Sequence, residues 1–564
     1  MKNITINFGG RRQRLLAAAF VLTLGLGACK VTDLQPVDAL SETAVYNDPA
    51  RIALAVTGVY NSAQSGFYDP LNGSALGVRG YPFGAAANSL GDARGEDVVD
   101  MAGFYGIIYN PSTVTPAAPN VVNIWSNCYA LINQANVTID GVKGAVAANV
   151  IPAATGTVYE AELRFLRALA HFQLVLNFSR PYLDGAGTKP GVPYHDYAIN
   201  TPTAIAQGRT QDRGTVADDY TKMLADLDFA EANLPVTRTI TTGTTIPAPS
   251  VTRAAKGAAI ALKQRIRLHQ GNWASVVTEG SKLITGAAAP FISPIGGYKL
   301  ADTQRLTFPG GATASAESIF SVENRSDDNP GTNGALANVF GSAASAANGG
   351  IGGRALLAVS PTLYNATFFT CSDLRRTTMM QLDPTGSGRY VIRKYTDAAT
   401  SSDFAPIIRY AEVLLNQAEA VARTGGNDAL SLSLLNAVRN RSVTTAADQY
   451  AAGSLTGAAL IRAILNERRI EFVGEGLRWG DLSRLALDAT YAPIAGGGIP
   501  AKFNGNLGAG QISAARYGCQ DQAKLTGGDP AAIGSVPYSS NFFLWPIPAL
   551  EIANNASLKQ NDGY

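Results

Sequence analysis

Small and apolar residues recur at helical spacing in two stretches of the chain, residues 253–284 and 407–442. In each stretch they follow one another at three- and four-residue steps, and a glycine–asparagine turn then interrupts them, at Gly271 and at Gly425. Residues at this spacing share one face of a helix. Turns that contain glycine and asparagine typically end a helix. Both stretches therefore predict a pair of antiparallel helices, the second beginning at Ile407.

Three more stretches show a similar periodicity, around residues 47–61, 124–178 and 459–485. Repeated helix pairs bury a shared face by stacking on their neighbours, as in tetratricopeptide-type arrays. The array is expected to be imperfect, because no strict 34-residue period runs through the chain. The pattern predicts a mostly helical protein.

Between the helical stretches the sequence is rich in Gly, Ala, Ser and Asn, most clearly at residues 293–354 and 492–540. A short strand is expected there, at Ser318–Val322. Loops of this length in a compact protein usually serve binding. A loop-rich lobe is expected from residues 62–123, 293–405 and 490–545. For the tip near Gly341 to Gly353 the alternative is plain low-complexity flexibility.

The first thirty residues carry a basic start, an apolar run from Leu15 to Leu26, and the ending Leu26-Gly-Ala-Cys29. This order is typical of a secretory signal peptide, and the apolar run is shorter than the roughly 20 residues that a spanning helix needs. The ending resembles the bacterial lipobox, in which the cysteine is lipidated. We expect a signal peptide over 1–28, a lipidated tether over 29–45 and a single body over 46–564.

Composition excludes several classes of function. The net charge is only +2 and charged residues make up 16% of the chain, so there is no nucleic-acid signature. Three cysteines remain after Cys29, namely Cys128, Cys371 and Cys519. Because these cysteines are odd in number and far apart in sequence, a disulfide framework is not expected, although a single disulfide bond stays possible. With three histidines and no metal motif, no zinc site is expected, and no EF-hand spacing indicates calcium.

Four segments of the chain resemble the SusD/RagB family of outer-membrane nutrient-binding lipoproteins. They are Glu162 to Phe172 (ELRFLRALAHF), Arg409 to Ala420 (RYAEVLLNQAEA), Asn466 to Leu482 and the ending Leu544 to Tyr564. Their order, the chain length and the lipobox agree with that family.

The resemblance implies a mostly α fold of tetratricopeptide-like helix pairs in a right-handed superhelical scaffold. It also implies a ligand site in the loop-rich lobe, which contains a few short strands. It also implies a partner, a TonB-dependent outer-membrane barrel of the SusC type, and delivery to the outer membrane, which Lys30 after the cysteine permits. Binding would be non-covalent and free of cofactors. An oligosaccharide is favoured as the ligand, and a glycopeptide or peptide stays open.

The matching motifs themselves are interpreted as structural. Arg164 and Arg167 are expected to pair with acids of a neighbouring helix. Trp479 and Asp481 are expected to fix a helix-to-loop corner, with the ring buried and the carboxylate bound to backbone donors, Arg478 or Arg484.

Two other functions remain open at this point. A secreted glycosidase is one, because Glu467 and Glu471 lie one helical turn apart on one face. However, both acids belong to one helix with two arginines between them, whereas a glycosidase needs carboxylates on opposite sides of the sugar, one of them kept protonated. The other is a scaffold that binds a protein through its helical array.

A sugar site needs flat aromatic rings and fixed polar groups. Such residues are densest between Phe67 and Tyr109, interleaved with Gly and Pro as in a loop, whereas Trp125 and Tyr129 stand four apart on a helix and are expected to pack inside. The candidate ligand contacts are Phe67, Tyr68, Asn72, Arg79, Tyr81, Phe83, Asn88, Asp92, Arg94, Asp97, Phe104, Tyr105 and Tyr109.

Overall fold

Long helices form the body of the protein in a computed structural model that describes residues 41–65, 80–238, 251–342, 352–505, 512–525 and 532–564. The body helices are α2 (Glu42–Tyr46), α3 (Pro49–Ser65), α6 (Pro119–Ala147), α7 (Ala153–Phe178), α9 (Val216–Asn233), α10 (Lys256–His269), α11 (Trp273–Ser281), α17 (Tyr410–Thr424), α18 (Asp428–Arg439), α19 (Gly457–Phe472) and α20 (Arg478–Arg484).

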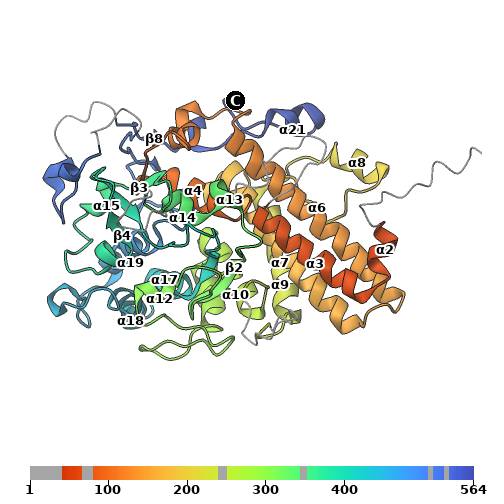
Figure 1. Ribbon diagram of the computed structural model, residues 1–564, viewed down its shortest axis with the longest axis horizontal. Helices are drawn as coiled ribbons and strands as arrows, with labels where there is room; N and C mark the ends of the chain where they lie inside the picture. Colours follow the sequence, from red (N-terminus) through yellow and green to blue (C-terminus); the bar gives the residue numbers. More distant parts are fainter. Residues whose placement is uncertain (1–40, 66–79, 239–250, 343–351, 506–511, 526–531) are drawn as a thin grey trace, which may run out of the picture.

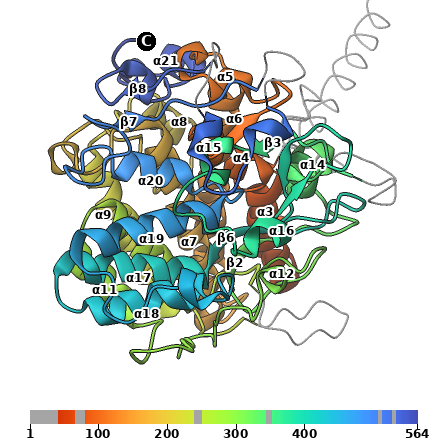
Figure 2. The same cartoon turned by 90° about the vertical axis from the view of Figure 1, so that its left-hand side faces the viewer.

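These helices pack on one another largely in sequence order, as Figures 1 and 2 show. α6 contacts α7, α7 contacts α9, and the series continues through α10 and α11 to α17, which contacts both α18 and α19. Fully buried alanines such as Ala258 and Ala259 on α10 let the helix axes approach closely. The prediction of a mostly helical fold built from stacked helices is confirmed.

One helix boundary is wrong in the sequence prediction, because the second helical stretch does not begin at Ile407. Residues Ala405–Arg409 form strand β6, which pairs antiparallel with β2 (Ser318–Val322), and the helix begins at Tyr410. Pro406 lacks a backbone N–H, and branched Ile407 and Ile408 favour a strand. The predicted strand at 318–322 is confirmed, and its partner is the segment that periodicity assigned to a helix.

Helix α9 was not predicted, although its start carries a clear signal. The Thr215 hydroxyl accepts from the Asp218 N–H, and the Asp218 carboxylate accepts from the Thr215 N–H, which is a capping box. Its apolar face buries Tyr220, Met223 and Leu227 between α7 and α10. The many acidic residues of this helix weaken its apolar pattern.

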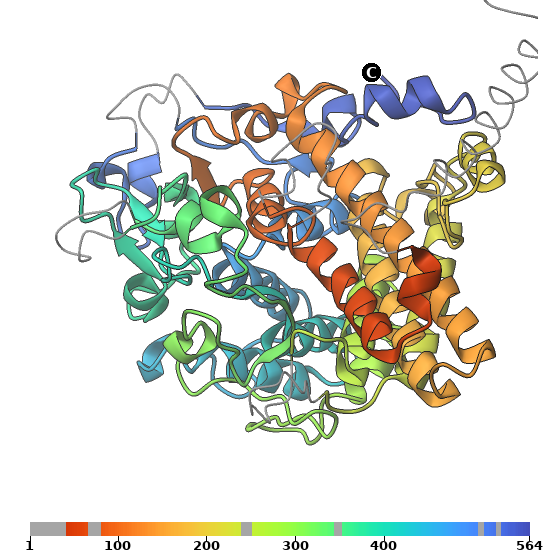
Figure 3. The same ribbon diagram turned by 45° about the vertical axis from the view of Figure 1, so that its right-hand side comes forward.

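Short elements make up the lobe, on the left in Figure 3. Strands β1 (Val98–Asp100), β3 (Leu357–Val359), β5 (Tyr390–Ile392) and β4 (Met380–Leu382) form an antiparallel sheet in the order β1-β3-β5-β4, and β7 (Gly498–Ile499) pairs with β8 (Val536–Pro537). The short helices are α4 (Ala85–Ala93), α5 (Gly106–Tyr109), α12 (Gln304–Thr307), α13 (Gly331–Gly334), α14 (Leu336–Phe340), α15 (Pro361–Tyr364) and α16 (Arg375–Thr378), and α21 (Ala549–Asn554) lies near the C-terminus.

A network of buried ion pairs joins the end of the helical body to the lobe. Its centre is the Glu471 carboxylate on α19, which is 1% exposed. It accepts from Arg375 Nη1 at 2.8 Å, from Arg409 Nη1 at 2.8 Å and from Arg441 Nη2 at 2.6 Å. The three arginines come from α16, from the end of β6 and from the loop after α18. One carboxylate therefore ties together four segments that are distant in sequence.

The electrostatics of this site favour the charged carboxylate. Burial raises the pKa of Glu471, but the charges of Arg441, Arg409 and Arg375 together lower it well below its usual value. Arg409 also binds Glu475 and Glu317, so the positive charges are themselves matched. The network is thus balanced inside the protein.

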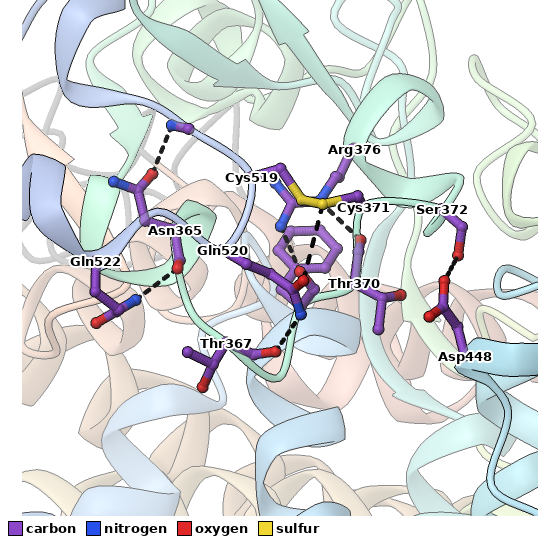
Figure 4. The surroundings of a disulfide bond; sticks show 12 residues. Asn365, Thr367, Thr370, Cys371, Ser372, Arg376, Asp448, Cys519, Gln520 and Gln522 are labelled. Atoms are coloured by element: carbon purple, nitrogen blue, oxygen red, sulfur yellow. Dashed lines mark hydrogen bonds between the residues drawn. A yellow bond between two sulfur atoms is a disulfide. The ribbon is translucent and has the colours of Figure 1, made fainter.

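A disulfide closes the lobe (Figure 4). Cys371 and Cys519 are 148 residues apart and their Cα atoms lie 5.5 Å from each other. Around the bridge, Asn365 accepts from the Gly518 N–H at 3.0 Å and donates to the Arg516 carbonyl at 2.9 Å. The bridge settles the question that the odd cysteine count left open, and Cys128 is a buried free thiol.

None of the helices in the described residues combines the length and apolar character needed to cross a bilayer.

We expect the substitution Glu471→Gln to lower the free energy of unfolding by about 3–5 kcal/mol at neutral pH, because three buried guanidinium groups lose their common anion. The folded pKa of Glu471 lies below its unfolded value near ~4.3. The wild type therefore holds this stabilisation above about pH 5 and loses it as the pH falls further. Urea unfolding between neutral and acid pH should show the two proteins converging at low pH.

The matched control is Glu323→Gln, at an exposed carboxylate, which should change the free energy of unfolding by less than about 0.5 kcal/mol. Equal stability of E471Q and wild type at neutral pH would contradict the assigned role.

Replacing both Cys371 and Cys519 by Ser should lower the free energy of unfolding by about 2–5 kcal/mol, the usual effect of losing a native disulfide. Dithiothreitol should destabilise the wild type by a similar amount and leave the double variant unchanged. The variant Cys128→Ala should keep the response to dithiothreitol. Alkylation of Cys371 and Cys519 in the non-reduced, unfolded protein would show that no bridge exists.

Candidate functional site

The two glutamates considered for glycoside hydrolysis lie inside the ion network. Glu467 accepts from Arg375 at 2.5 Å and from Arg439 at 3.2 Å, and Glu471 faces three arginines. A catalytic acid must keep its proton, which requires a raised pKa, whereas the pKa of Glu471 is lowered. Both side chains are 1% exposed. Both glutamates therefore lack the access that an acid catalyst needs, and Glu471 also lacks the proton.

Several predicted site residues lie outside the described residues. They are the lipidation site Cys29 and the candidate ligand contacts Phe67, Tyr68, Asn72 and Arg79.

Four predicted aromatic contacts are packed inside the lobe. Tyr81, Phe83, Tyr105 and Tyr109 are each at most 3% exposed. The Tyr109 hydroxyl donates to the Phe503 carbonyl at 2.5 Å, which holds β1 and its following loop against the segment after β7. These rings shape the lobe from within, and ligand contact by them stays a prediction.

Arg94, another candidate contact, is a buried cation between two indole rings. Its guanidinium carbon lies 3.3 Å from the Trp479 ring centre and 4.5 Å from that of Trp545. It donates to the Asn177 side chain at 2.9 Å and to the Phe543 carbonyl at 3.0 Å. Stacking and hydrogen bonds thus replace a counter-ion, and Arg94 joins α4 to α7 and to the C-terminal segment.

The polar candidates near Arg94 are also engaged in the interior. Asp92 accepts from the Gly474 N–H at 2.5 Å, and burial raises its pKa to about 7. Asp97 forms ion pairs with Arg469 and with Arg478, the latter at 3.3 Å. These contacts fasten the 85–100 segment to the end of α19 and the start of α20. Ligand contact by these two residues stays a prediction.

The motif residues interpreted as structural have the expected kinds of partner. Arg167 on α7 pairs with Asp226 of α9 at 2.6 Å. The buried Trp479 donates to the Leu176 carbonyl at 2.9 Å, and Asp481 pairs with Arg484 at 2.8 Å.

Phe104 differs from the other aromatic candidates, because its ring is only partly buried. The guanidinium carbon of the exposed Arg354 lies 4.9 Å from the centre of this ring. Arg354 also donates from Nη1 to the Asn333 side-chain oxygen. An aromatic ring, a cation and an amide thus meet at the protein surface. We call Phe104, Asn333 and Arg354 the candidate surface.

Backbone hydrogen bonds position two of the segments that form the candidate surface. The Met101 N–H donates to the Leu356 carbonyl at 2.9 Å, extending the β1–β3 pairing toward Phe104 and Arg354. The Arg354 N–H donates to the Asn338 carbonyl at 2.7 Å, which ties this residue to α14. Asn333 lies on α13, which contacts α14 and α4. These elements lie together in Figure 1.

Sequence reasoning identified Phe104 but missed Asn333 and Arg354. Arg354 directly follows the tip near Gly341 to Gly353, for which low complexity was the alternative interpretation. No local signal distinguishes them, because their position depends on strand pairing over 250 residues.

A cavity of about 70 Å³ lies between α4, α7, α10 and α20, with Phe83 and Asn88 among its lining residues. Ligand pockets usually enclose roughly 300–1,000 Å³. This space suits water molecules rather than a sugar ring.

Within the described ranges, no group of three His, Cys, Asp or Glu side chains is arranged to hold a metal ion.

Two family models match the chain. The model of the SusD family matches residues 383–564, and a model described as starch-binding associating with the outer membrane matches residues 105–268. A SusD-like protein of Formosa agariphila is 22% identical over 531 residues, covering 85% of this chain and 92% of that protein.

Solved structures show the same fold. A SusD superfamily protein from Bacteroides fragilis matches with a TM-score of 0.69 and 25% identity, over 91% of this chain and 100% of that one. A laminarin-binding SusD-like protein matches with a TM-score of 0.62 and 19% identity, over 92% and 100%. From the two family models and this shared architecture, we conclude that the chain belongs to the SusD/RagB family.

Proposed function

We propose that this protein captures oligosaccharides at the outer membrane, without cleaving them, and delivers them to a SusC-like TonB-dependent barrel. The observation that carries the proposal is the candidate surface, where a partly exposed ring, a guanidinium and an amide meet on the lobe. Membership of the SusD/RagB family and the likeness to a laminarin-binding relative support it.

The chemistry of the candidate surface suits a sugar. The apolar C–H faces of a pyranose pack against aromatic rings, while its hydroxyls need donors and acceptors at the rim. Here the sugar would meet the partly exposed Phe104 ring and the exposed Arg354 guanidinium, with Asn333 beside them. Because these backbones are held by strand pairing, little ordering is needed on binding.

Capture without cleavage is supported by the state of the acidic residues. Glu471 is enclosed by three arginines, which hold its pKa well below the usual value, and the buried Glu467 pairs with Arg375 and Arg439. Intact oligosaccharide recovered after incubation would agree with capture, and shortened products would favour the glycosidase alternative.

Membrane attachment is the second part of the proposal. The lipobox ending at Cys29 supports a lipid anchor. Several lipid chains on one protein anchor it stably in a membrane, whereas a single chain binds only marginally. Helix α2 begins soon after, at Glu42, and packs on α3 and α6. The body would thus lie close to the membrane on its outer side.

Substituting Phe104→Ala should weaken oligosaccharide binding by about 3- to 10-fold, because an aromatic contact contributes about 0.5–1.5 kcal/mol beyond buried area. Isothermal titration calorimetry with glucan oligosaccharides would measure this. The matched control is Phe229→Ala, which removes a ring packed under Arg164 on the helical body and should leave affinity unchanged. Equal affinities for F104A and wild type would contradict the placement of the site, and binding of peptides alone would contradict the ligand class.

The full-length protein should co-purify with a large β-barrel protein from detergent-solubilised outer membranes. Replacing Cys29 by Ser should remove the protein from the outer-membrane fraction, because the lipid is its proposed attachment. Recovery of the wild type alone from gently solubilised membranes would count against the transporter partner.

A further inference from the structure

We infer that the captured glycan is acidic, and that Arg354 recognises the carboxylate of a uronic acid residue. This inference rests on the proposed function, because it names the class of sugar that the candidate surface takes. It starts from Arg354, an exposed cation with no carboxylate partner among the residues that the structure describes.

Several buried arginines of the protein are matched by acids. Arg375, Arg409 and Arg484, for example, each pair with at least two carboxylates. Arg354 differs, because within the described residues its guanidinium contacts the Phe104 ring and the neutral Asn333 amide rather than a carboxylate. A ring and an amide orient a guanidinium without neutralising it. Its charge is therefore available to a ligand.

The surrounding segment is also unbalanced in charge. Residues 352–398 contain six Lys and Arg against three Asp, whereas the whole chain has 45 against 43. The three acids are engaged locally. Asp373 pairs with Arg375 at 2.7 Å, and Asp383 and Asp397 accept from serine and threonine hydroxyls. Arg375 and Lys394 are buried and pair with Glu471 and Glu475. Within the described residues, the positive charge that this part of the lobe exposes without an acidic partner therefore includes Arg354.

Carboxylate recognition fits this geometry better than recognition of a neutral sugar. A guanidinium donates two parallel hydrogen bonds to a carboxylate, and such charge-assisted bonds are roughly twice as strong as neutral ones. A uronic acid joins that carboxylate to a pyranose ring, so one residue satisfies both Arg354 and Phe104. A neutral hexose offers only a hydroxymethyl group at the same position.

The test is calorimetry on the full chain with an oligogalacturonate and with the same oligosaccharide after its carboxylates are reduced to hydroxymethyl groups. The wild type should bind the acidic form at least about tenfold more tightly, since one charge-assisted pair is worth at least about 1.4 kcal/mol. The preference should shrink as salt is added, because the surface pair is exposed.

Substitutions separate recognition of the acid from capture itself. Arg354→Gln should abolish the preference, Arg354→Lys should retain part of it, and Arg325→Gln, at an exposed arginine paired with Asp327, should leave it intact. Equal binding of both oligosaccharides, still weakened by F104A, would overturn the acidic class while capture stands. Binding of neither these nor neutral glucans would overturn the proposed function.

Discussion

The buried Glu471 carboxylate is the constraint on which the arrangement of this protein depends. The lobe strands are only two to five residues long, and sheets of such strands need packing against other elements to be stable. Arginines from α16, β6 and the loop after α18 converge on one side chain at the end of α19. The helical array, whose helices contact their neighbours in sequence, thereby holds in place a lobe whose strands come from segments that are distant in sequence.

This arrangement explains why the candidate surface lies where it does. Arg409 anchors the β2–β6 ribbon, Asp97 is held by arginines of α19 and α20, and β1 continues from there to Phe104. The stacked Arg94 fixes the same segment from its other side. The candidate surface thus lies at the end of a chain of buried contacts that hold its segments in place. Under the proposed function, such preorganisation would lower the entropic cost of binding.

The sequence allowed the helices to be predicted far better than the contacts between them. Periodicity located α10 and α17, because an apolar face recurs within a few residues. It missed α9, whose apolar positions are separated by acids. It also extended a helix over Ile408, whose strand partner Phe320 lies 88 residues earlier. The partners of Glu471 were not predictable, since nothing local to α19 indicates which arginines will reach it.

For the candidate site, too, the sequence did not reveal which single residues come together at the surface. The segment between Phe67 and Tyr109 was selected for its aromatic and polar content, yet its described members are mostly interior. Phe104 and Tyr105 are neighbours in sequence with different exposure, because the loop after β1 turns one ring outward. Arg354 completes the surface from a glycine-rich stretch that composition alone marks as flexible.

The most direct test of this account is a structure of the protein determined with a bound oligosaccharide. The account predicts a sugar ring in contact with Phe104 and Arg354, with the Glu471 network unchanged from the unbound protein. A ligand bound elsewhere, with Phe104 and Arg354 left exposed to solvent, would contradict it.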